Sequence, residues 1–110
     1  MSENVQRLLS ELRSELQNLF GEKLKDIILF GSYARGDYDK ESDIDIIALV
    51  DDTDLEKYND KIIDIEVELT IKHGVMPSIL VENKAYFSRN PRREYLFENV
   101  LKDGQAIYNA

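Results

Sequence analysis

The sequence predicts an α/β (α+β) fold, in which helices alternate with the strands of a short sheet. Three observations support this prediction. An apolar stripe with helical spacing opens the chain, two apolar runs of strand length flank a glycine-containing turn, and a second helical pattern precedes a third apolar run. Such interleaving is typical of layered folds that combine helices with a sheet. With a length of 110 residues, we expect one domain over residues 1–110.

The first helix is predicted to begin after Ser2 and to end at Gly21. Serine is a common N-terminal cap, and glycine is common directly after the last turn of a helix. Between these residues, apolar side chains recur every three or four positions, which predicts one face packed against a core. That face consists of Val5, Leu8, Leu9, Leu12, Leu16, Leu19 and Phe20.

Two strands are expected next, over about residues 25–30 and 43–50, because both segments are short apolar runs. A second helix is expected over about residues 54–73, since a cluster of aspartates precedes it and Gly74 follows it. Its predicted buried face consists of Leu55, Tyr58, Ile62, Ile65 and Leu69.

The last third of the chain predicts one more strand and one more helix. The apolar run at residues 75–81 reads as a third strand, although Pro77 favours an edge or irregular position. The last helix is predicted to begin at Pro91 and to end at Gly104, because proline is favoured at helix starts and glycine at helix ends.

Two carboxylates stand at the beginning of the second predicted strand. Side chains alternate along a strand, so Asp43 and Asp45 share one face while Ile44 points to the other. Two like charges roughly 6–7 Å apart repel each other and lose hydration beside a buried run. A cation between them removes this cost, and Mg²⁺ prefers such oxygen ligands. The alternative is a pair of solvated acids at a strand start.

The turn after the first strand is suited to binding phosphate. Gly31 allows a sharp bend and a close approach to the backbone. Ser32 is expected to cap a short helical turn whose N–H groups and hydroxyl face an anion. Arg35 adds a forked cation that suits phosphate oxygens. The alternative is an ordinary turn, with Arg35 paired on the surface to Asp37 or Asp39.

These residues together carry a family resemblance. Gly31-Ser32, ten further residues and then Asp43-Ile44-Asp45 resemble the signature of the DNA polymerase beta-like nucleotidyltransferase superfamily. The full string GSYARGDYDKESDID, which includes Ser42, is similar to the minimal nucleotidyltransferases (MNT), which often serve as antitoxins beside a HEPN-domain ribonuclease toxin. The resemblance implies the polymerase beta-like fold, a short mixed sheet flanked by helices.

The resemblance also implies a reaction, the transfer of AMP from ATP to a hydroxyl, most plausibly on a partner toxin of the HEPN family. ATP would bind through Gly31, Ser32, Arg35 and Ser42, and Mg²⁺ through the catalytic pair Asp43 and Asp45. In two-metal sites of this kind, one ion activates the attacking oxygen and the other neutralises the leaving group.

The sequence departs from the family pattern at the third carboxylate, which many members supply from a later strand. Ser78 occupies the place where that acid is expected. Glu82 lies at the far end of the same strand, and three acids of the preceding helix are poor substitutes: Asp64, Glu66 and Glu68.

Composition narrows the class of protein. The chain has no cysteine, which excludes disulfide scaffolds, zinc ribbons and thiol catalysis. No apolar run reaches membrane-spanning length and no signal-peptide pattern opens the chain, so we expect a cytoplasmic protein without membrane contact. The formal net charge of −8 argues against direct nucleic-acid binding and fits a partner with a basic face.

Three functions remain open on the sequence. The first is an enzyme that transfers AMP to a partner protein. The second is a non-catalytic nucleotide-binding antitoxin, which the missing third acid favours. The third is a small-molecule nucleotidyltransferase that works as a homo-oligomer, namely a homodimer in which the second subunit completes the acceptor site.

Overall fold

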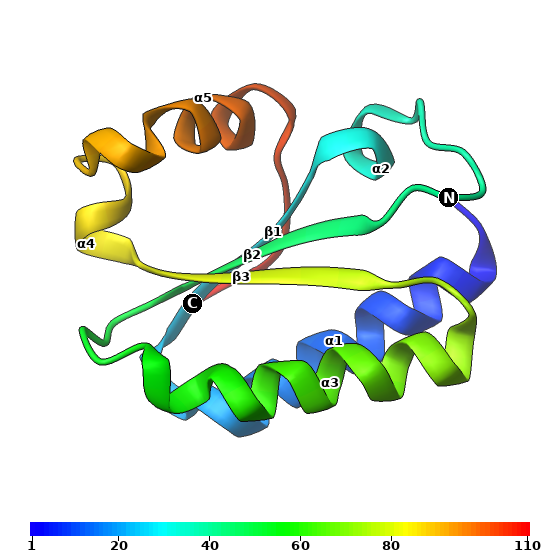
Figure 1. Ribbon diagram of the computed structural model, residues 1–110, viewed down its shortest axis with the longest axis horizontal. Helices are drawn as coiled ribbons and strands as arrows, with labels where there is room; N and C mark the ends of the chain where they lie inside the picture. The colour runs from blue at the N-terminus through cyan, green and yellow to red at the C-terminus, as the bar shows by residue number, and fades with distance from the viewer.

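The structure, a computed structural model, describes residues 1–110. A four-stranded sheet lies between two layers of helices (Figure 1). Its strands are β1 (Leu24–Phe30), β2 (Ile44–Val50), β3 (Pro77–Asn83) and β4 (Gln105–Asn109), in the spatial order β3-β2-β1-β4. The predicted α/β (α+β) class with a short sheet is confirmed.

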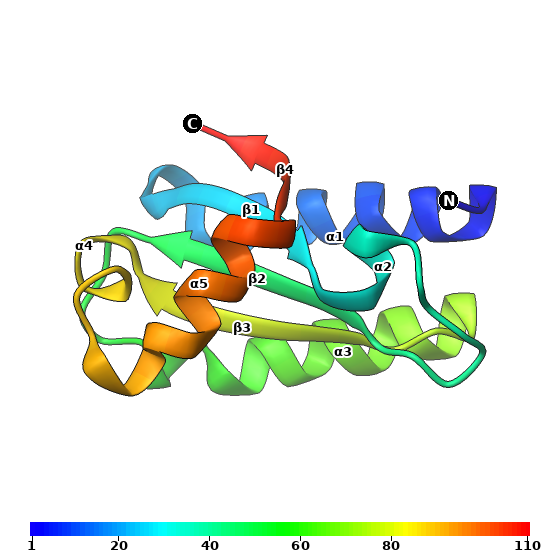
Figure 2. The same ribbon diagram turned by 90° about the horizontal axis from the view of Figure 1, so that it is seen from above.

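Two long helices cover one face of the sheet, α1 (Glu3–Phe20) and α3 (Asn59–His73), and three shorter ones lie on the other side (Figures 1 and 2). The shorter helices are α2 (Gly31–Arg35), α4 (Lys84–Phe87) and α5 (Glu94–Asp103), and 3-10 turns occupy Gly21–Lys23, Glu56–Tyr58 and Pro91–Arg93. No helix has the length and apolar character needed to cross a bilayer.

Strand directions in the sheet are mixed. β1 pairs antiparallel with both β2 and β4, whereas β2 and β3 are parallel. A parallel pair needs a long crossover connection, which α3 provides here. The free edges are therefore β3 on one side and β4 on the other.

Alternation along the strands divides the core into two parts. The side chains of Ile44 and Ile46 pack into the larger part, between the sheet and the pair α1 and α3. Ile47 and Leu49 pack into a smaller part with Phe87 of α4 and Val100 of α5. The predicted apolar face of α1 is buried, and only Leu19 is half-buried. The buried residues are Val5, Leu8, Leu9, Leu12, Leu16 and Phe20.

The predicted ends of α1 are confirmed, because the Ser2 hydroxyl accepts the N–H of Val5 and Gly21 follows the last residue. α3 begins at Asn59, five residues later than predicted. The cause is local: an Asp52 carboxylate oxygen accepts the N–H of Asp54 at 3.0 Å and holds that segment as a turn.

The third strand also lies slightly later in the chain than predicted. β3 spans Pro77–Asn83 rather than residues 75–81. Its pairing with β2 starts only after Met76, whose carbonyl accepts the N–H of Ile44 at 2.9 Å. As predicted, Pro77 stands at the start of an edge strand, where its missing N–H costs nothing.

One strand, β4, was not predicted. It follows Gly104, pairs with Asp26–Leu29 of β1 and forms an edge of the sheet. Its side chains are mostly exposed or half-buried, so the segment lacks the apolar run that would reveal a strand. The Asn109 amide fastens its end by donating to the buried Asp26 carboxylate at 2.8 Å.

The junction of β1 and α2 requires glycine. Gly31 has φ +73°, and a Cβ added there would overlap the carboxylate oxygen Oδ2 of Asp45. Gly36, at the other end of α2, has φ +86° but open space around it. Gly31 is therefore required both by its positive φ angle and by the lack of space for a side chain. Gly36 is required only by its positive φ angle.

These two glycines give a matched pair of substitutions. Gly36→Ala should lower the free energy of unfolding by about 1–2 kcal/mol, the usual cost of a left-handed non-glycine residue. Gly31→Ala should cost more, because the new methyl group also displaces Asp45. Urea unfolding measures both. Equal losses would show that the contact with Asp45 imposes no constraint.

A second polar cluster lies beyond the far end of β2. The Asp52 carboxylate accepts from the Tyr58 hydroxyl at 2.5 Å and pairs with Lys57 at 3.0 Å and Lys23 at 3.1 Å. The hydrogen bond from Tyr58, followed by that from Lys57, holds the pKa of Asp52 well below its usual range. Its backbone carbonyl also accepts from Asn83 at 2.8 Å, which joins this turn to the end of β3.

Asp52→Asn should lower the melting temperature at pH 7. Because the folded-state pKa of Asp52 is depressed, its contribution is complete above the unfolded-state pKa of about 4 and is lost as the pH falls below that value. The difference between variant and parent should therefore shrink below about pH 4. Asp54→Asn is the control, since the side chain of Asp54 makes no hydrogen bond or ion pair. A difference independent of pH would contradict the ionic origin.

Candidate functional site

The Gly-Ser turn and the two acids come together at one end of the β1–β2 pair. Phe30, the last residue of β1, stands opposite Asp45 in the antiparallel register. α2 starts at the next residue, so its first turn lies directly against the Asp45 carboxylate. The sequence prediction that these two motifs form one site agrees with this arrangement.

The cap of α2 differs from the prediction. The residue before the helix is Phe30, and no side chain caps it, whereas Ser32 lies within the first turn. The first N–H groups of a helix have no partner within the helix, and the half-buried Ser32 hydroxyl stands among them. The turn can thus still offer donors to an anion, without Ser32 acting as the cap.

The two acids face the side of the sheet that carries α2 and α5. Their alternation with the buried Ile44 and Ile46 sets this direction. Asp43 is exposed and Asp45 half-buried, and neither forms a hydrogen bond or ion pair within the chain. Burial, and then the charge of Asp43, raise the pKa of Asp45, and the more distant charge of Arg35 opposes them.

This environment fits a divalent cation. Two carboxylates without a partner repel each other, and a bound cation would satisfy both and remove the pKa shift of Asp45. No histidine, cysteine or further acid lies close enough to these two aspartates to serve as a third protein ligand. Mg²⁺ tolerates such a small protein ligand set, because it retains waters and takes substrate phosphate oxygens as further ligands.

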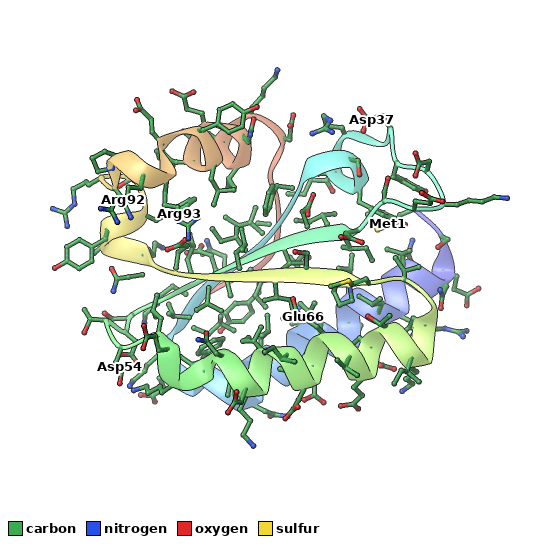
Figure 3. All side chains as sticks on the ribbon, viewed as in Figure 1. Met1, Asp37, Asp54, Glu66, Arg92 and Arg93 are labelled. Carbon is green, nitrogen blue, oxygen red and sulfur yellow. The ribbon has the colours of Figure 1, made fainter.

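Arg35 does not point at the acids. Its guanidinium pairs with Asp37 at 3.1 Å and with Asp103, the last residue of α5, at 3.2 Å. The hydrogen bonds to Asp37 and then Asp103 raise the pKa of Arg35. Asp37 lies in the loop after α2, at the outer side of the molecule (Figure 3). Arg35 can contact a phosphate only by exchanging these carboxylates for it.

Ser42 organises the loop that leads to the acids. Its hydroxyl accepts the N–H of Asp39 at 3.0 Å and lies 3.3 Å from a carboxylate oxygen of the same residue. The loop is braced further by Tyr33, a buried residue of α2, whose ring stacks on Tyr38 at 4.1 Å between centroids. Both contacts limit the positions that Asp43 can take.

The sheet register shows where Ser78 lies, the residue found in the sequence at the position expected for the third acid. Ser78 stands directly opposite Asp45 in the parallel β2–β3 pair and shares its face. Glu82 lies four residues further along and is paired with Arg93 at 2.9 Å. Glu66 accepts the N–H of Ile79 at 2.9 Å on the edge of β3. None of these glutamates can replace the missing carboxylate.

Two contacts to the site were not predicted, and both come from the end of the chain. Gln105 donates its side-chain amide to the carbonyl of Ala34 at 2.8 Å, and Asp103 pairs with Arg35. Together they fasten α2 to the end of α5 and the start of β4. No sequence pattern signals such pairs, because about seventy positions separate the partners.

Comparisons with known proteins show the family of this chain. Residues 9–105 match the sequence model of the nucleotidyltransferase domain. A protein of Methanocaldococcus jannaschii, whose provisional name places it among the protein adenylyltransferases, is 38% identical over 105 residues, 96% of this chain and 99% of its own. Protein adenylyltransferase MntA of Thermococcus cleftensis is 30% identical over 91 residues, 73% of this chain and 90% of its own.

Solved structures show the same fold. A toxin-antitoxin structure with AMP-PNP superposes with a TM-score of 0.66 at 21% identity, covering 93% of this chain and 73% of that one. A complex of a tri-AMPylated Shewanella oneidensis HEPN toxin with its MNT antitoxin gives 0.61 at 20% identity, covering 96% and 72%. At these identities the likeness concerns the fold alone. The sequence matches and the geometry of the Gly31–Asp45 junction lead to one conclusion: the chain belongs to the nucleotidyltransferase domain family.

Proposed function

We propose that residues 1–110 act as one minimal nucleotidyltransferase domain that transfers AMP from ATP to a hydroxyl of a partner protein. The observation that carries this proposal is the contact of the Gly31 turn with Asp45, which brings phosphate-binding groups and two unpaired carboxylates together. The names of the relatives, which include protein adenylyltransferases, support AMP as the transferred group.

In this proposal, the turn at Gly31 and Ser32 binds the triphosphate, and Arg35 exchanges Asp37 and Asp103 for a phosphate. Asp43 and Asp45 would hold Mg²⁺, which neutralises charge on the phosphates when bound. The acceptor oxygen attacks the α-phosphorus while its proton passes to water, the bond from the α-phosphorus to the oxygen that bridges it to the β-phosphate breaks, and pyrophosphate leaves with that electron pair. Ser42, through Asp39, keeps the loop and Asp43 in place. The chain contributes positioning and charge rather than covalent chemistry.

We infer that the partner is a HEPN-family toxin and that this chain is its antitoxin. The structures with the same fold include a complex of an MNT antitoxin with a HEPN toxin and a toxin-antitoxin structure with AMP-PNP. A net charge of −8 also suits a partner that carries a basic RNA-binding face.

Ser78 favours a second candidate function, a nucleotide-binding antitoxin without transferase activity. Without a third acid, no side chain of the site is placed to take the proton of the acceptor hydroxyl. In that case the chain would neutralise its partner by binding alone.

One prediction of this proposal concerns the transfer of AMP to the partner. Incubation of the chain with Mg²⁺, α-labelled ATP and its co-expressed partner should move label onto the partner. Asp43→Asn or Asp45→Asn should reduce labelling by about a hundredfold or more, because each removes a ligand of the cation. Neither change should lower the melting temperature, because burial and then the charge of Asp43 raise the pKa of Asp45, and each change removes at least one of these unfavourable effects.

The control is Glu41→Gln, which removes one negative charge from the same loop at an exposed side chain without a partner. It should leave labelling unchanged. If the parent transfers no label but still binds ATP in a way that depends on Mg²⁺ and on both aspartates, the binding antitoxin is the correct function.

Another prediction concerns a substitution that introduces the missing third acid. Ser78→Asp places a third carboxylate beside Asp45, so folding stability without Mg²⁺ should fall and Mg²⁺ should restore it. Labelling should rise on the order of tenfold, less than the ~10²–10⁴ of an evolved general base. Ser78→Asn, nearly equal in size but uncharged, should show neither effect. A Mg²⁺ response shared by both variants would argue against a cation at this place.

A further inference from the structure

α3 carries a second apolar stripe that the fold leaves exposed. Its inner face packs into the core through Ile62, Ile65 and Leu69. On the outer side, Ile63, Val67 and Ile71 follow one another at intervals of four residues, so they line up along the helix. Their exposed fractions are 54%, 53% and 80%. We call these three residues the outer stripe of α3.

A helix on the surface of a globular protein usually has one apolar side, and a second, contiguous one marks an interaction surface. The outer stripe also continues beyond its helix. Met76, exposed just before β3, closes one end of a shallow apolar hollow that is lined by Ile63, Glu66, Val67, Thr70, Ile71 and Met76.

The charged residues nearest the outer stripe are acidic. Asp60, Asp64 and Glu68 follow its flank at the same interval of four, and all are exposed. Lys61 and Lys72 lie beyond this row, on the side toward α1, where Lys72 pairs with Glu11 at 2.8 Å and Lys61 lines a hollow together with Asp64 and Glu68. No basic residue lies between these two lysines in the sequence.

The neighbouring sheet edge is closed to an added strand. β3 is a free edge, but Glu66 reaches across from α3 and accepts the N–H of Ile79 at 2.9 Å. Figure 3 shows Glu66 on the side of α3 that faces β3. A strand that pairs with β3 would have to displace this carboxylate, so the surface is better suited to a helix lying along the outer stripe.

A second copy of this chain is a poor occupant of the same surface. The outer stripes of two copies would bring two rows of aspartate and glutamate together, and like charges across an interface weaken binding. A partner with lysine or arginine beside its apolar side chains would instead gain from every acid of the row.

From these observations we propose that the outer stripe of α3 is a docking surface for an amphipathic helix with basic flanks, supplied by a partner protein. The surface lies on the face of the sheet opposite to Asp43 and Asp45, so docking there is separate from nucleotide binding (Figure 1). The proposal does not rest on the transfer reaction, and either can fail without the other.

The test uses a synthetic helical peptide of about 18 residues with a leucine stripe flanked by lysines, titrated into the isotope-labelled chain. NMR shifts should be confined to α3, Met76 and the edge of β3. Val67→Asp, at an exposed position that tolerates a polar side chain, should weaken binding about tenfold or more. Ser10→Asp, which adds the same charge at an exposed position of α1, should not.

A peptide with glutamate in place of lysine should bind more weakly than the basic one, and the difference should shrink at high salt. Equal binding of the two peptides, absence of binding, or shifts elsewhere on the chain would overturn the proposal. So would a dimer in light scattering that Val67→Asp dissociates, because the occupant would then be a second copy. The circular dichroism spectrum and melting temperature of Val67→Asp, measured in parallel, show that the variant is folded.

Discussion

The site depends on one close approach, that of the Gly31 backbone to the Asp45 carboxylate. The antiparallel register of β1 and β2 sets Phe30 opposite Asp45, so the chain must turn away at the next residue with no room for a side chain. That single constraint fixes where α2 starts. It also leaves Asp45 half-buried beside another acid, which raises its pKa. A turn suited to anions and an acid pair suited to cations are thus consequences of one contact.

Local patterns were enough to predict most of this arrangement. The ends of α1 follow from Ser2 and Gly21, and the shared face of Asp43 and Asp45 follows from alternation along a strand. Apart from the start of α3, which the local turn at Asp52 delays, the features that were missed are those that a distant contact decides. β4 forms because β1 offers an open edge and not because its own residues demand a strand, and the pairing of Arg35 with Asp103 joins positions 68 residues apart.

The sheet separates two kinds of surface. On one side, polar groups of α2 and the start of β2 meet at an open, charged position that suits a small anionic substrate and its cation. On the other side, α3 presents an apolar, acid-flanked stripe that suits a protein. Since a rigid sheet lies between the two surfaces, a protein held on α3 would leave the acids open to nucleotide. This arrangement is consistent with a chain that can bind a partner whether or not it modifies it.

The contacts of Asp103 and Gln105 with α2 have a consequence for the synthesis of the chain. The residues of the phosphate turn and the acid pair, 31–45, leave the ribosome early, but Asp103 and Gln105, which fasten α2, emerge about sixty residues later. β1 likewise gains its second neighbour only when β4 has been translated. A nascent chain would therefore carry every motif residue without a fixed site. The ability of this domain to bind nucleotide should appear only after β4 has been translated, and changes near β4 should affect the site that lies far earlier in the sequence.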